Sequence, residues 1–62
     1  MKSIMEMISA QWTDDQSGET FMVMFSVDAA QANLVRITEL AHELLKDEGA
    51  DLLLSEVEWE YL

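Results

Sequence analysis

The chain has 62 residues, no cysteine and no proline, and its thirteen acidic residues face three basic ones, a formal net charge of −10 at pH 7. This length predicts one acidic mini-domain over residues 1–62, the lack of cysteine excludes disulfides and cysteine-type zinc sites, and the charge disfavours direct binding to nucleic acid or anionic membranes. The hydrophobic fraction of 50% is too high for a disordered chain, no apolar run approaches the ~20 residues that span a bilayer, and no secretory signal opens the sequence, so we expect a soluble cytoplasmic protein.

The first two patterned segments predict a β-hairpin. Residues 3–12 and 19–27 alternate between two faces and are rich in aromatic and β-branched side chains, which is typical of strands. The intervening residues include Asp14 and Gly18, which suit the start of a turn and a position of positive φ. We therefore expect the two segments to pair as neighbouring antiparallel strands.

The register of this hairpin follows from the two faces of its strands. When Trp12 pairs with Phe21, the large apolar side chains share one face. A slip of one residue would mix apolar and polar sets, so the pattern favours this register. The opposite face then carries, among serine, threonine and glutamine, the four methionines Met5, Met7, Met22 and Met24.

The third pattern predicts a helix from about Asp28 to Glu48. Asp28 is a good N-cap residue, and Gln31 follows three residues later, as in a capping box. Apolar residues then recur at helical spacing. Gly49 supplies a C-terminal stop.

Residues 51–61 predict a third strand, because the alternation is strict from Ser55 onward. The leucine run at 52–54 offers an alternative, a prolonged helical turn. A right-handed crossover makes the third strand parallel to the second and places it beside the first. We predict an α+β fold of ββαβ order, with a three-stranded antiparallel sheet (order 2-1-3) and one helix packed on one face. The predicted core comprises Ile4, Ile8, Trp12, Phe21, Val23, Phe25, Leu34, Ile37, Ala41, Leu44, Val57 and Trp59.

The face of the sheet that the helix leaves uncovered is the predicted binding surface. Exposed methionines form a soft apolar patch, and such patches often mark interaction sites. Alternate glutamates on the third strand stand about 6.6 Å apart, which roughly matches successive phosphates along a nucleic-acid strand. Two alternatives stay open. In the first, the glutamates form only a solvated, charged edge strand that prevents aggregation, and in the second, the methionines form a homodimer interface. The predicted partner-binding residues are Glu56, Glu58, Glu60, Met5, Met7, Met22 and Met24.

Signals for chemistry are few. Glu39 and His42 are three residues apart, which is half of a carboxylate-bridged di-iron helix motif, and Glu43 adjoins them. A metal-binding dimer would need a second copy, and the alternative is an exposed polar helix face. The chain has no glycine-rich phosphate loop and no nucleophile elbow, so we expect no enzyme, no cofactor and no metal.

No motif assigns the chain to a family. In size, charge and expected surface it is similar to small acidic inhibitors of phages and mobile elements, such as anti-CRISPR and anti-restriction proteins that mimic DNA. That likeness implies inhibition and assigns no residue a role. The leading hypothesis is an acidic module that blocks a basic, nucleic-acid-binding protein. The alternative is a small homodimeric structural or assembly protein that associates through its Met-rich sheet face.

Overall fold

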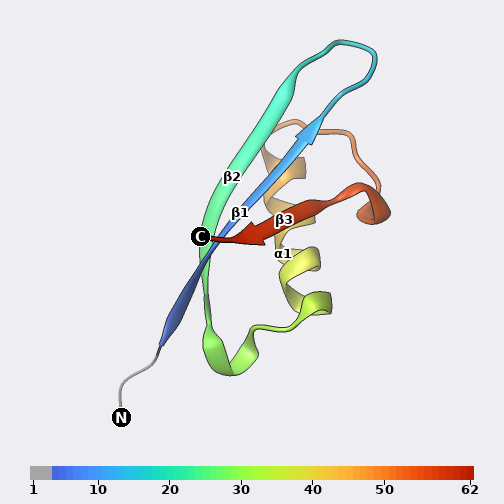
Figure 1. Ribbon diagram of the computed structural model, residues 1–62. Coiled ribbons are helices and arrows are strands. Elements are labelled where there is room, and N and C mark those ends of the chain that lie inside the picture. The colour runs from blue at the N-terminus through green and yellow to red at the C-terminus, as the bar shows by residue number, and fades with distance from the viewer. Residues whose placement is uncertain (1–3) are drawn as a thin grey trace.

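The computed structural model describes residues 4–62 of the chain. Strand β1 (Met5–Thr13) pairs antiparallel with β2 (Thr20–Asp28) on one side and with β3 (Glu58–Tyr61) on the other. The sheet order is therefore β2-β1-β3, and helix α1 (Leu34–Asp47) lies on one side of the sheet (Figure 1). The predicted α+β fold and strand order are confirmed.

The hairpin has the predicted register, with Trp12 opposite Phe21. The turn closes through two backbone bonds: the Asp14 N–H donates to the Glu19 carbonyl at 2.8 Å, and the Asp14 carbonyl accepts from the Gly18 N–H at 2.8 Å. Gly18 has a φ of +77°, a left-handed conformation that glycine adopts without a steric penalty. The turn chemistry visible in the sequence therefore fixes the pairing of the two long strands.

The helix begins later than predicted. The Asp28 carboxylate caps a turn by accepting a bond from the Ala30 N–H at 2.9 Å, but that turn is the separate 3-10 segment η1 (Ala29–Gln31). Asn33 caps α1, because its side-chain oxygen accepts from the Arg36 N–H at 2.9 Å. Two extended residues, Ala32 and Asn33, separate η1 from α1. Two good capping residues lie close together in the sequence and both are used, so the predicted start at Asp28 is wrong.

The end of the helix agrees with the prediction. Gly49 has a φ of +105°, and its N–H donates to the Lys46 carbonyl at 3.0 Å. The next residue, Ala50, donates to the Leu45 carbonyl at 3.0 Å, which completes a Schellman motif. Among residues 4–62, no helix combines the length and apolar character needed to cross a membrane.

The third strand begins later than predicted. Leu54–Glu56 form a second 3-10 turn, η2, and the Glu56 carboxylate accepts a bond from the Leu53 N–H at 2.7 Å. This local bond competes with extended pairing, so the strand is limited to Glu58–Tyr61. The predicted start of the first strand at Ser3 lies outside the described residues.

The core lies between α1 and the sheet. Ile37, Ala41 and Leu45 of α1 are fully buried, as are Ile8 and Ala10 of β1. A helix of 14 residues is about 21 Å long, whereas a nine-residue strand is about 30 Å long, so the hairpin extends past the helix (Figure 1). Several predicted core side chains are consequently only half-buried; these are Trp12, Phe21, Val23, Phe25, Leu44, Val57 and Trp59.

Two predicted core residues are exposed instead. Leu34 is 73% exposed and Ile4 is 67% exposed. Both lie at the end of an element, where no second layer covers them: Leu34 opens α1, and Ile4 precedes β1. The prediction left out five buried residues: Ala10, Val27, Leu45, Ala50 and Leu52. The last two follow the helix and close the core from that side.

This packing predicts that replacing a leucine with alanine lowers stability strongly at Leu45 and hardly at all at Leu34. Leu45→Ala removes a fully buried side chain, so we expect it to lower the free energy of unfolding by about 2–5 kcal/mol. Leu34→Ala removes an exposed one, so we expect a change within about 0.5 kcal/mol. Urea denaturation followed by tryptophan fluorescence measures both. Equal losses at the two sites would contradict the late helix start.

Candidate functional site

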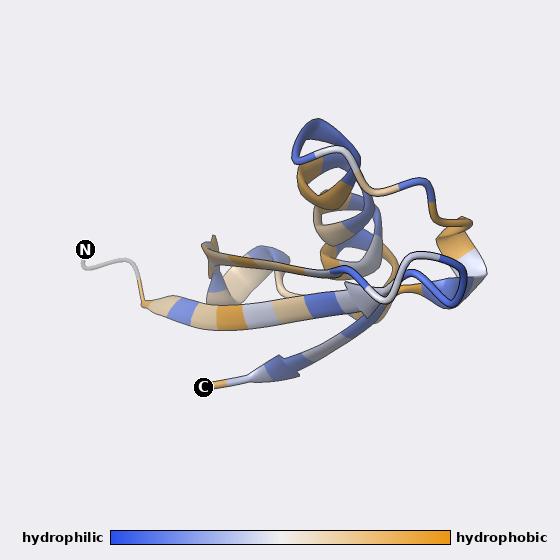
Figure 2. Ribbon diagram, turned by 90° about the horizontal axis from the view of Figure 1, so that it is seen from above, coloured by the Kyte–Doolittle hydropathy of each residue, from blue (hydrophilic) through white to orange (hydrophobic). Residues whose placement is uncertain are grey.

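The side of the sheet opposite α1 is a continuous surface, here called the open face. Because successive side chains of a strand point to opposite sides, it carries the odd-numbered residues of β1 and the even-numbered residues of β2 and β3. Figure 2 shows that β1 carries both polar and apolar residues along its length. Across the three strands, one row of this face is Met24, Ser9 and Glu60, and the next row is Met22, Gln11 and Glu58.

The four methionines of the open face are all exposed, between 44% for Met7 and 60% for Met24. They do not lie opposite one another across the ladder, because each faces a polar or acidic residue on the neighbouring strand. Met5 and Met7 form one pair along β1, Met22 and Met24 form another along β2, and the pairs approach diagonally at Met7 and Met24. The apolar patch is therefore a staggered band with serine and glutamine beside it.

Leu62 extends this band and was missed from the sequence. Its backbone N–H donates to the Met7 carbonyl at 3.0 Å, so the pairing of β1 with β3 continues past Tyr61. Leu62 is 66% exposed and has the even number of the open-face residues of β3. The sequence did contain a signal for Leu62, because the period-2 alternation of the third strand can be continued from Tyr61 to Leu62.

An acidic surface follows β3, on the far side of the open face from β2. Glu58 and Glu60 lie on the strand, about 6.6 Å apart along it. Glu56 is not a third rung of this ladder, because it lies in η2 and its carboxylate caps Leu53. A shallow depression is nevertheless lined by Glu56, Glu58 and Asp15 of the hairpin turn. We call Asp15, Glu56, Glu58 and Glu60 the acidic edge.

Asp15 belongs to the acidic edge for a reason that the sequence does not carry. The hairpin turn and the start of β3 are far apart in the chain, and they meet because both adjoin the same end of β1. No local pattern near Asp15 signals that contact.

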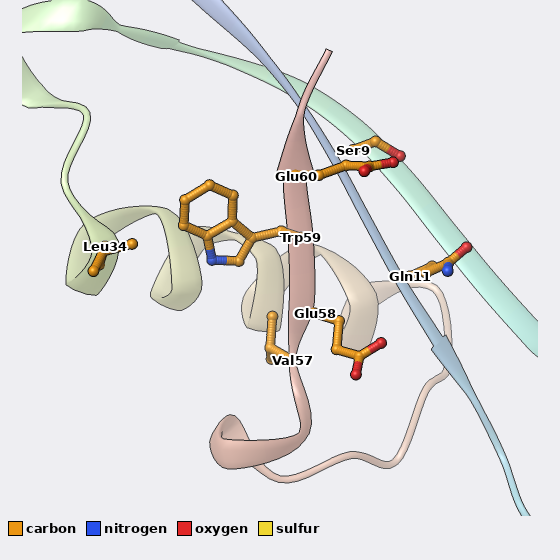
Figure 3. A pocket seen from close by; sticks show the side chains of 7 residues that line it. All are labelled: Ser9, Gln11, Leu34, Val57, Glu58, Trp59 and Glu60. Atoms are coloured by element: carbon orange, nitrogen blue, oxygen red, sulfur yellow. The ribbon is translucent and has the colours of Figure 1, made fainter.

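A hollow with a volume of about 580 Å³ lies around β3, and the strand divides it into two parts. Figure 3 shows Ser9, Gln11, Glu58 and Glu60 on one side of β3, and Leu34, Val57 and Trp59 on the other. The Trp59 indole N–H donates to the Thr38 hydroxyl of α1 at 2.9 Å, which anchors the strand to the helix. The result is two shallow surfaces on either side of an edge strand, which suit a protein partner better than an enclosed small molecule.

The three strands carry no lysine or arginine. Arg36 and Lys46 both lie on α1, on the other side of the sheet. The acidic edge therefore has no cation on its own strands to neutralise it, and its negative potential extends toward solvent.

His42 has a structural contact that the sequence did not indicate. Its Nε2 atom lies 3.0 Å from the Leu52 carbonyl oxygen, and the side chain is half-buried rather than part of an exposed polar face. A carbonyl only accepts, so Nε2 carries the proton and donates. Within the described part of the chain, no three histidine, cysteine, aspartate or glutamate residues are grouped to hold a metal ion. The residues Glu39, His42 and Glu43 are thus not assembled into a site within one chain.

Comparison with known proteins adds no assignment: no family model, no curated protein and no solved structure matches the chain. The open face and the acidic edge are the surfaces that could support a function. These surfaces present thioether, hydroxyl, amide and carboxylate groups. That combination suits recognition of a protein surface that is basic and partly apolar.

The contact of His42 leads to a stability prediction. His42→Phe keeps an aromatic ring but removes the donor, so we expect the free energy of unfolding to fall by about 1 kcal/mol, since the Leu52 carbonyl loses its partner. Glu43→Gln, at the exposed neighbouring position, is the control and should change it by less than about 0.5 kcal/mol. Thermal unfolding with and without Zn²⁺ completes the experiment. A Zn²⁺-dependent stabilisation that His42→Phe abolishes would instead identify His42 as a metal ligand.

Proposed function

We propose that this protein is an acidic binding module that occupies the basic, nucleic-acid-binding surface of another protein and inhibits it. The observation that carries the proposal is the acidic edge: Glu58 and Glu60 project from an exposed strand, Asp15 and Glu56 adjoin them, and no cation lies on the strands beside them. Carboxylates held on a strand are positioned in advance, so little ordering entropy is lost on binding.

Mimicry of a phosphate backbone is the proposed mode. The spacing of about 6.6 Å between Glu58 and Glu60 roughly matches successive phosphates along a nucleic-acid strand. Glu56 does not continue that line, so the mimicry extends over two carboxylates on the strand and two beside it. The basic partner would contact these four groups, and the methionines across the open face would add apolar contact and adaptability.

The biological setting that this mode suits is that of a phage-type inhibitor, of the anti-CRISPR or anti-restriction kind, acting in the cytoplasm. Such an inhibitor needs no catalytic group, cofactor or metal, and we propose none here. It binds its target rather than nucleic acid, because the net charge of −10 repels phosphate.

The proposal predicts a specific loss of partner capture. Wild-type protein is used as bait in nuclease-treated bacterial lysate, beside Glu58→Gln/Glu60→Gln. We expect the wild type to retain a nucleic-acid-binding protein that moderate salt releases, since charge pairs on a surface are screened. The double variant should bind that protein about two- to thirtyfold more weakly, because each surface charge pair contributes about 0.2–1 kcal/mol.

The matched control is Glu39→Gln/Glu43→Gln, which removes the same charge from exposed positions of α1. It should leave capture within about twofold of the wild type, since these positions are not on the open face. Equal losses in both double variants would show that only total charge matters. Competition by DNA against the captured protein then tests whether the nucleic-acid site itself is covered.

The homodimeric alternative is favoured by one observation, the exposure of all four open-face methionines. It assigns the charge to solubility and the open face to stacking with a second sheet. Association of that kind is driven by apolar burial, so salt should not weaken it. Capture of a basic protein that depends on Glu58 and Glu60 would argue against it as the main function.

A further inference from the structure

The outer edge of β2 is open, and the hydrogen bonds at the two ends of the hairpin show which groups it presents. The Asp14 N–H donates to the Glu19 carbonyl, and the Ala29 N–H donates to the Ile4 carbonyl. Both are pairs of the β1–β2 ladder, in which hydrogen-bonded and non-hydrogen-bonded pairs alternate. The odd-numbered residues of β2 therefore bond to β1. The N–H and C=O groups that point away from the sheet are those of Thr20, Met22, Met24 and Ser26.

Nothing in the described residues covers that edge. No backbone or side-chain hydrogen bond from a turn, loop or cap reaches the outward groups of Met22, Met24 or Ser26. The strand spans nine residues, and residues 20–27 contain no charge and no proline. Figure 2 shows largely hydrophobic colours along β2. Natural edge strands of this length are normally protected by charge, proline or a covering element.

We propose that β2 pairs antiparallel with β2 of a second copy of this chain, about a two-fold axis, to form one continuous sheet with three strands from each copy. This proposal does not depend on the inhibitor function. It also differs from stacking of two open faces, because the contact is backbone pairing at an edge.

The pattern of β2 is complementary to itself. Only even-numbered residues have free backbone groups, so hydrogen-bonded pairs across the axis join even to even, for example Met24 to Met24 or Met22 to Ser26. Side chains of equal parity point to the same side, so the methionine bands of both copies become one surface. On the helix side, the half-buried Phe21, Val23 and Phe25 of one copy meet their equivalents, which adds the burial that a single short helix leaves incomplete.

Charge also favours a second copy at this edge over a basic partner. Two chains of −10 repel each other, so they approach best where the surface is uncharged, and residues 20–27 form such a surface. A basic protein would find no carboxylate along that stretch to attract it. The acidic edges lie at the two outer sides of the joined sheet, about five strand spacings or 24 Å apart, which exceeds the Debye length of about 8 Å at physiological salt.

The experiment measures molar mass by light scattering and sedimentation from micromolar to millimolar concentration, for the wild type and two variants. Ser26→Pro removes an outward N–H and should not break the ladder to β1. Met7→Lys places a charge on the central strand of the open face, away from the β2 edge. We expect a dimer of twice 7.1 kDa for the wild type and for Met7→Lys. Ser26→Pro should raise the dissociation constant at least about tenfold, because each copy loses one N–H donor at the edge and leaves a carbonyl of its partner unpaired.

Amide hydrogen exchange of the wild type keeps the proposal testable if Ser26→Pro fails to fold. The amides of Met22 and Met24 should become protected as concentration rises, whereas those of Phe21 and Val23 should be protected at all concentrations. A monomeric wild type, or Met22 and Met24 amides that exchange freely at the highest concentration, would overturn the proposal. So would a dimer that Met7→Lys abolishes and Ser26→Pro preserves, because that result assigns the contact to stacked faces.

Discussion

The alternation of β1, the central strand, is the constraint on which the rest of the molecule depends. Its even-numbered residues bond to β2 and turn their side chains toward α1, and its odd-numbered residues bond to β3 and turn theirs to the open face. Ile8 and Ala10 are fully buried as a result. Shifting β1 by one residue would place Met7 and Ser9 in the core and would expose Ile8 and Ala10. Core, open face and acidic edge are thus set by one register.

The small size of the domain explains much of its surface. One helix of 14 residues cannot cover two strands of nine, so the large side chains at the β2 edge and beside β3 are only half-buried. The chain compensates with local bonds that cost little entropy: the Asp28 cap of the turn η1, the Asn33 cap of α1, a Schellman motif after α1, and the cap made by Glu56. The contacts of Trp59 with Thr38 and of His42 with Leu52 then tie the last segment to the helix.

The two edges of the sheet differ in a way that separates the roles proposed for them. The β3 edge is short and strongly acidic, which discourages pairing with another strand and favours a basic surface. The β2 edge is long, and residues 20–27 carry no charge, which allows strand pairing and gives a basic partner no carboxylate to pair with. The two proposals are therefore compatible: pairing at the β2 edge would leave the carboxylates of the β3 edge accessible. The methionine band lies between the two edges and becomes larger if the sheet is joined.

The amino-acid sequence alone determined the hairpin, its register, the end of the helix and the order of the strands. Period-2 alternation, a glycine at positive φ and a C-terminal glycine are local signals, and the pairing of Trp12 with Phe21 was the register that kept apolar residues together. Only the tertiary structure decided the start of α1 at Leu34, the place of Glu56 and the role of His42. At those points a short-range bond competes with the periodic pattern, or two distant segments meet: Asn33 breaks the helical run, Glu56 caps a turn, and Leu52 supplies the acceptor for His42. A sequence pattern records the period of an element, whereas such contacts depend on where the chain is already held in space.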